Sequence, residues 1–214
     1  MIYWISVYTS FTVCIAALIA VFRFRKIDPL YFPFILCIWI GAINETLSFA
    51  LAQSGYSNIA NNNVYILLEA RLILWQFKRW NMLHPYTYLI FVVLLYATWL
   101  YEIHSWQSLQ NLHYYFRLLY AAVVVICAIS FNNRLIISHH NKLVTNPGFI
   151  ICTGYILYFT IKIACDVWWL YDAKSSTEFL TIVFLTMIGS NFVTNFLFIL
   201  AIIWIPRKPD YITF

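Results

Sequence analysis

The sequence predicts an all-α, polytopic membrane protein in which residues 1–214 form a single domain of seven transmembrane helices. The chain is 63% hydrophobic and only 10% charged, whereas soluble domains carry roughly 25% charged residues. Its apolar residues gather in seven long stretches, and most of its basic residues lie in every second loop. This composition excludes a soluble or disordered protein, and its 13 scattered basic residues are too few for a nucleic-acid-binding surface.

Each of the seven stretches is close to the length of about 20 apolar residues that a helix needs to cross a bilayer. In chain order they are 2–22, 30–52, 62–78, 86–101, 113–133, 149–172 and 179–205. Charged, proline or amide clusters bound them: Arg23–Pro29, Asn61–Asn63, Lys78–Pro85, Asn132–Arg134, Asn146–Pro147 and Pro206–Pro209.

Three of these stretches need separate justification. The first has no basic residues before it and no small-residue cleavage site after it, so we expect a retained helix. The third is short and contains Glu69 and Arg71, which leaves open an alternative with six spans and a re-entrant third segment. The sixth follows Pro147, which suits the first turn of a helix because proline lacks the N–H that would be unpaired there.

The distribution of Lys and Arg predicts the orientation of the chain. Nine lie in the loops and tail on one side: Arg23, Arg25, Lys26, Lys78, Arg79, Arg134, Lys142, Arg207 and Lys208. The loops on the other side hold one, Lys174, beside the acidic residues Glu102, Asp172 and Glu178. Because basic loops stay in the cytoplasm, we expect the N-terminus outside and the C-terminus inside, in the inner (plasma) membrane and in contact with the lipid bilayer.

Six ionisable residues lie within the predicted spans: Glu45, Glu69, Asp166, Arg71, Arg117 and Lys162. Such residues are costly in a membrane, and they usually face the interior of the bundle with a partner. Lys162 and Asp166 are four residues apart and therefore share one helix face. Asn191 and Asn195 have the same spacing on the last helix.

We expect these side chains to line a polar cavity in the outer half of the bundle, formed by the second, third, fifth, sixth and seventh helices. The candidate ligand-binding residues are Glu69, Lys162, Asp166, Tyr65, Tyr158, Asn191, Asn195, Glu45, Arg117 and Trp39, the last at mid-depth. The alternative is that the buried charges and amides only hold the helices in register.

The sequence contains no pattern that predicts catalysis, a metal or a cofactor. It has no GxSxG, no HExxH and no glycine-rich phosphate loop, and the last helix has no lysine for a retinal. The five cysteines lie within spans without metal-ligand spacing. We therefore expect a protein that is not an enzyme.

The segment Asn62-Asn63-Val64-Tyr65-Ile66-Leu67-Leu68-Glu69, the Asn146-Pro147 start of the sixth helix and the amides of the seventh resemble small uncharacterised bacterial seven-helix membrane proteins. They also resemble the membrane input domains of some sensor kinases. This resemblance implies a sensing or ligand-binding role. We therefore expect a ligand-binding or sensory module that acts through a membrane or cytoplasmic protein partner. The alternatives are a transporter of small solutes or ions that uses the midplane charges, and an accessory subunit of a membrane complex.

Overall fold

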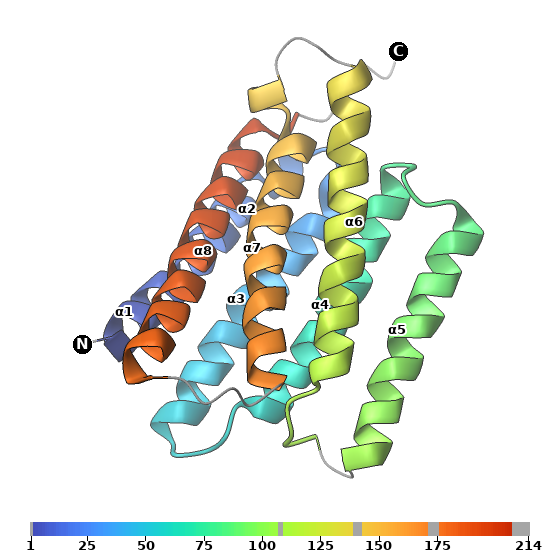
Figure 1. The fold of residues 1–214 in the computed structure, drawn as a ribbon. Coiled ribbons are helices and arrows are strands. Elements are labelled where there is room, and N and C mark those ends of the chain that lie inside the picture. The colour runs from blue at the N-terminus through green and yellow to red at the C-terminus, as the bar shows by residue number, and fades with distance from the viewer. Residues whose placement is uncertain (1, 107–108, 139–142, 171–175, 207–214) are drawn as a thin grey trace, which may run out of the picture.

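The computed structural model describes residues 2–106, 109–138, 143–170 and 176–206, and this part of the chain is helical and contains no strand. The helices run up and down in an antiparallel bundle, in which α6, α7 and α8 lie in front of α2, α3 and α4 (Figure 1). The α-helices are α1 (Ile2–Ser10), α2 (Thr12–Arg23), α3 (Phe32–Gln53), α4 (Ile59–Arg79), α5 (Pro85–Trp106), α6 (Tyr114–Ser138), α7 (Pro147–Leu170) and α8 (Thr177–Trp204).

Helices α1 and α2 correspond to the first predicted span, which is interrupted at Phe11. Hydroxyl groups that bond to the preceding turn are a known cause of helix bending. Here the Thr9 hydroxyl donates to the carbonyl of Ser6 over 2.9 Å, and that of Thr12 donates to the carbonyl of Thr9. The interruption does not shorten the apolar segment, because Trp4–Lys26 as a whole is long enough to cross a membrane.

The described residues form a membrane protein. Six of its helical segments are long and apolar enough to span a bilayer: Trp4–Lys26, Pro29–Gln53, Pro85–Ser105, Tyr114–Ile137, Pro147–Leu170 and Thr177–Trp204. The remaining long helix, α4, has 21 residues, which at 1.5 Å per residue span roughly 30 Å, about the thickness of the hydrocarbon core. Its amides and charges keep it out of the apolar class, although it is one continuous helix over the third predicted span.

Helix α4 packs against α3, α5 and α6, and a buried amide joins it to the start of α3. The Gln76 side chain accepts a hydrogen bond from the backbone N–H of Phe34 and donates one to the carbonyl of Leu30, both over 2.9 Å. The first N–H groups of a helix have no partner within the helix. Gln76 therefore provides the hydrogen-bond acceptor that the N–H of Phe34 would lack in a bilayer.

The sequence places Glu102 in a loop between two predicted spans, where it would be solvated, but the structure shows it buried within a helix. It lies within α5, is only 1% exposed, and accepts hydrogen bonds from the N–H groups of Tyr115 and Phe116 over 3.0 and 2.8 Å. A carboxylate at this place is favourable because a helix N-terminus is positively polarised. Glu102 thus joins α5 to the start of α6.

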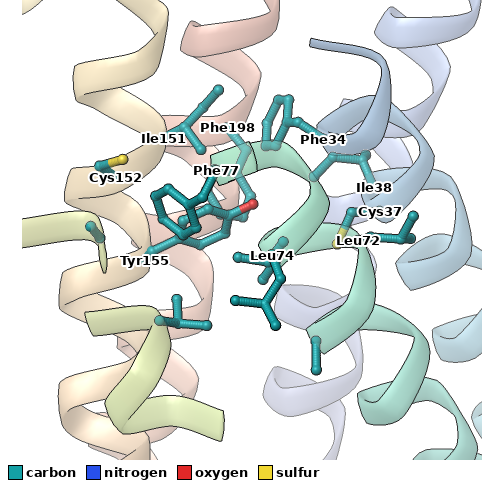
Figure 2. Packing of buried hydrophobic residues seen from close by; sticks show 14 of the residues in the cluster. Phe34, Cys37, Ile38, Leu72, Leu74, Phe77, Ile151, Cys152, Tyr155 and Phe198 are labelled. Atoms are coloured by element: carbon teal, nitrogen blue, oxygen red, sulfur yellow. The ribbon is translucent and has the colours of Figure 1, made fainter. Parts of the chain in front are cut away.

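Four buried aromatic side chains pack together inside the bundle (Figure 2). Phe198 contacts Phe34 and Tyr155 with ring centroids 5.3 and 5.4 Å apart, and Tyr155 reaches Phe77 at 6.4 Å. These rings come from α3, α4, α7 and α8, and they meet mostly edge to face, the favoured geometry of aromatic pairs. We call Phe34, Phe77, Tyr155 and Phe198 the aromatic layer.

Candidate functional site

A cavity of about 180 Å³ lies between the helices, on the side of the aromatic layer that faces the α3–α4 connection. Helices α3, α4, α6, α7 and α8 all contribute to its wall, as expected from the sequence, and α1 and α2 add Ser10 and Val13. Eight of the candidate residues line it: Glu45, Tyr65, Glu69, Arg117, Tyr158, Lys162, Asn191 and Asn195.

Asp166 does not line the cavity but lies beside two of the lining bases. It is 3% exposed, and its Oδ2 atom is 3.3 Å from Nε of Arg117 and 3.8 Å from Nζ of Lys162. The i,i+4 pairing of Lys162 with Asp166 is therefore present, and α6 supplies a second cation to the same carboxylate. The Asp166 carboxylate thus pairs with two buried cations, Arg117 and Lys162.

Trp39, the tenth candidate, lies outside the cavity. Its indole N–H donates to the carbonyl of Ala17 over 3.2 Å, and its ring packs on Phe24 at 5.1 Å. The physical reason is the phase of the helix: at about 100° per residue, Trp39 points roughly 200° away from the lining position Gly41. Trp39 lies at the depth of the cavity along the helix, but its side chain points away from the cavity.

The acidic wall of the cavity is formed by Glu69 on α4 and Glu45 on α3. The Tyr65 hydroxyl donates a hydrogen bond to Oε1 of Glu69 over 2.7 Å. In the described part of the chain, neither Glu45 nor Glu69 has a basic nitrogen within 4.0 Å. Both acids therefore lie outside the cluster formed by Arg117, Lys162 and Asp166.

The third base within the spans, Arg71, takes no part in the cavity. Its guanidinium lies over the ring of Tyr88 at 4.9 Å from the centroid, and Lys78 lies over the same ring at 4.6 Å. Such cation–π contacts offer a cation a partner without a carboxylate.

Amides complete the polar wall. The Asn195 side chain donates to the Thr12 hydroxyl over 2.9 Å and to the Asn191 carbonyl oxygen over 3.4 Å. On the opposite side, Asn44 accepts a hydrogen bond from Asn61 over 2.8 Å. These contacts tie α8 to α2 and α3 to α4 around the cavity.

The ten candidate residues do not include every residue that lines the cavity. The others are Ser10, Val13, Cys37, Ile38, Gly41, Asn44, Asn62, Ile66, Tyr155, Phe159, Met187, Thr194 and Phe198. None of them carries a charge, and most cannot be told apart in sequence from residues that only pack the core. Asn44 and Asn62 are exceptions, since each lies within a span close to an acid that was selected.

A second cavity of about 140 Å³ adjoins the first, with Ser10 and Glu45 in the walls of both. It runs between α1 and α3 toward Ala52 and Asn58, which are exposed at the α3–α4 connection. Two rings of the aromatic layer, Tyr155 and Phe198, therefore line the charged cavity, and Glu45 lies where it meets the second cavity.

The described residues contain no group of three His, Cys, Asp or Glu side chains placed to hold a metal ion. Their fold and site define a helical membrane protein with a charged internal cavity. Comparison of the chain with protein-family models, with curated proteins and with solved structures finds no match.

Proposed function

We propose that this protein is a seven-span membrane protein that binds a small polar ligand in the cavity beside the aromatic layer. It acts as a non-enzymatic sensory module and passes the binding event to a protein partner. The observation that carries this proposal is a cavity of about 180 Å³ with two acids and two bases in its wall. Protein interiors are close-packed, with few voids larger than one water molecule, so packing alone does not explain such a space.

The size of the cavity limits the ligand. A liquid water occupies about 30 Å³, and an apolar cavity of about 150 Å³ holds one benzene molecule. The present cavity is similar in volume but polar. It therefore suits a polar molecule about as large as benzene, or a small cluster of waters in the unliganded state.

In the proposed topology α4 also crosses the membrane, as the third span in chain order, which brings the number of spans from six to seven. Seven crossings separate the two ends of the chain, and α1 begins at the opposite end of the bundle from the end of α8 (Figure 1). With the basic loops in the cytoplasm, the cavity faces the outside of the plasma membrane. The partner then meets the short inner connections, such as residues 80–84 between α4 and α5.

The aromatic layer favours binding over transport. An alternating transporter must open its site to both sides in turn. Here Phe34 and Phe77 are 1% and 0% exposed. To open the cavity toward the other side, the four rings of the aromatic layer, which come from four different helices, would have to move apart.

The proposal is tested by blocking the cavity. Met187 lines it, whereas Leu185 on the same helix is 43% exposed on the outside of the bundle. We expect native mass spectrometry to detect a small molecule bound to the wild type and to Leu185→Trp, but not to Met187→Trp. Equal occupancy of the two variants, or no small molecule on the wild type, would contradict the proposal.

A further inference from the structure

The charges around the cavity are separated by sign. Arg117 and Lys162 lie on α6 and α7, which pack against each other, and Glu45 and Glu69 lie on α3 and α4, which also pack against each other. Helices α6 and α7 lie in front of α3 and α4 (Figure 1). The cavity between them therefore has a basic wall and an acidic wall.

The basic wall retains hydrogen-bond donors for a ligand. Arg117 and Lys162 are only 9% and 5% exposed, yet both line the cavity. Arg117 uses only Nε toward Asp166, and Nζ of Lys162, at 3.8 Å from the same carboxylate, is beyond hydrogen-bond length. Among the hydrogen bonds of the described residues, the Arg117 side chain donates through Nε alone, and neither Nη group has a bonded acceptor. A planar guanidinium with free donors is well suited to bind a carboxylate.

The acidic wall retains an acceptor. The Tyr65 hydroxyl donates a hydrogen bond to Oε1 of Glu69, and no basic nitrogen of the described residues lies within 4.0 Å of this carboxylate. An ammonium group with its three donors fits a carboxylate oxygen that is flanked by an aromatic hydroxyl. Glu45 borders the second cavity as well, so an amine would pass it on the way to Glu69.

We infer, on the basis of the proposed function, that the ligand is a small zwitterion whose carboxylate meets Arg117 and Lys162 and whose ammonium meets Glu69. A ligand with a single charge is attracted to one wall and repelled by the other. A zwitterion in this orientation is attracted to both, which is the complementarity that confers specificity.

The test compares ligands that differ only in charge. The full chain is placed in phosphatidylglycerol nanodiscs, and binding is measured by calorimetry for the ω-amino acids from glycine to 6-aminohexanoate. The matched alkanoates and alkylamines are measured in parallel. We expect at least one ω-amino acid to bind about ten-fold or more tightly than both of its singly charged analogues, as one lost charge-assisted hydrogen bond implies.

Two variants assign the ends of the ligand. Glu69→Gln should remove the preference for the ω-amino acid over the alkanoate, and Lys162→Met should reduce the preference over the alkylamine. Gly189→Ala, at an exposed position with open space around its Cβ, should leave all affinities unchanged.

The inference is overturned if an alkanoate or an alkylamine binds as tightly as every ω-amino acid, or if no ω-amino acid binds. In either case the proposed function survives when the wild type still carries a small molecule that Met187→Trp excludes. A repeat in phosphatidylethanolamine nanodiscs identifies the source of the zwitterion. A weaker apparent affinity there assigns the site to a lipid headgroup, and an unchanged affinity assigns it to a free solute.

Discussion

At the scale of single residues, Asp166 is the group on which the buried charges depend. It is the one carboxylate within 4.0 Å of Arg117 or Lys162 in the described structure. Removing one member of a buried ion pair leaves a charge without compensation, whereas removing all members does not. The three residues therefore allow the cost of a lone charge to be separated from the value of the cluster.

We predict that Asp166→Asn lowers the free energy of unfolding by about 3–5 kcal/mol, because it leaves two buried cations without an anion. Lys162→Met should cost less, since Asp166 keeps Arg117 at 3.3 Å. The combined variant Arg117→Met/Lys162→Met/Asp166→Leu should recover most of the loss. Unfolding in detergent, followed by near-ultraviolet circular dichroism, measures all three. A loss for Lys162→Met as large as that for Asp166→Asn would show that the cluster is not centred on Asp166.

At the scale of elements, the contact between α7 and α8 depends on a glycine. A Cβ atom on Gly154 would lie 2.9 Å from Cε1 of Phe198 and 3.5 Å from Cγ2 of Thr194. Phe198 cannot easily move away, because its ring also contacts Phe34 and Tyr155. Small residues at helix contacts in membranes permit this kind of close approach.

We therefore predict that Gly154→Ala destabilises the bundle by about 1–3 kcal/mol, the usual cost of overpacking a filled core. Gly189→Ala on α8 is the matched control, since nothing lies within 4 Å of its added Cβ, and it should be close to neutral. Apparent melting temperatures of the two variants in the same detergent make the comparison. Equal melting temperatures would mean that the Phe198 ring relaxes freely and that the aromatic layer is not tightly packed.

At the scale of the whole molecule, the number of crossings depends on α4. Tyr56 precedes α4 and Val144 follows α6, and the two side chains are 71% and 73% exposed. Helices α4, α5 and α6 separate them. If α4 crosses the membrane they lie on opposite sides, and if it does not they lie on the same side.

We predict that a membrane-impermeant maleimide labels Tyr56→Cys in intact cells but labels Val144→Cys only after the cells are permeabilised. The wild type is the control, because its five free cysteines lie within helices and four of them are buried. Labelling of both variants in intact cells would favour six spans. The reverse pattern would invert the proposed orientation.

The helical fold and the helices around the cavity were predictable from local sequence. Long apolar stretches have one common solution in a bilayer, and charged residues within them turn toward the interior of the protein because lipid offers no compensation. Glu69, Lys162 and Arg117 are such residues, and all three line one cavity. The pairing of Lys162 with Asp166 was also predictable, since a spacing of four residues brings two side chains to the same face of a helix.

Tertiary packing decided which groups meet. The spacing of residues along one helix does not determine how that helix is rotated about its axis or which helices lie next to it. It directed Trp39 toward α2 and away from the cavity, and it brought Arg117 of α6 to the carboxylate of α7. It also buried Glu102 at the start of α6, where unpaired backbone N–H groups required an acceptor. Hydropathy and periodicity describe one helix at a time, whereas partners in a bundle are set by how all the helices pack together.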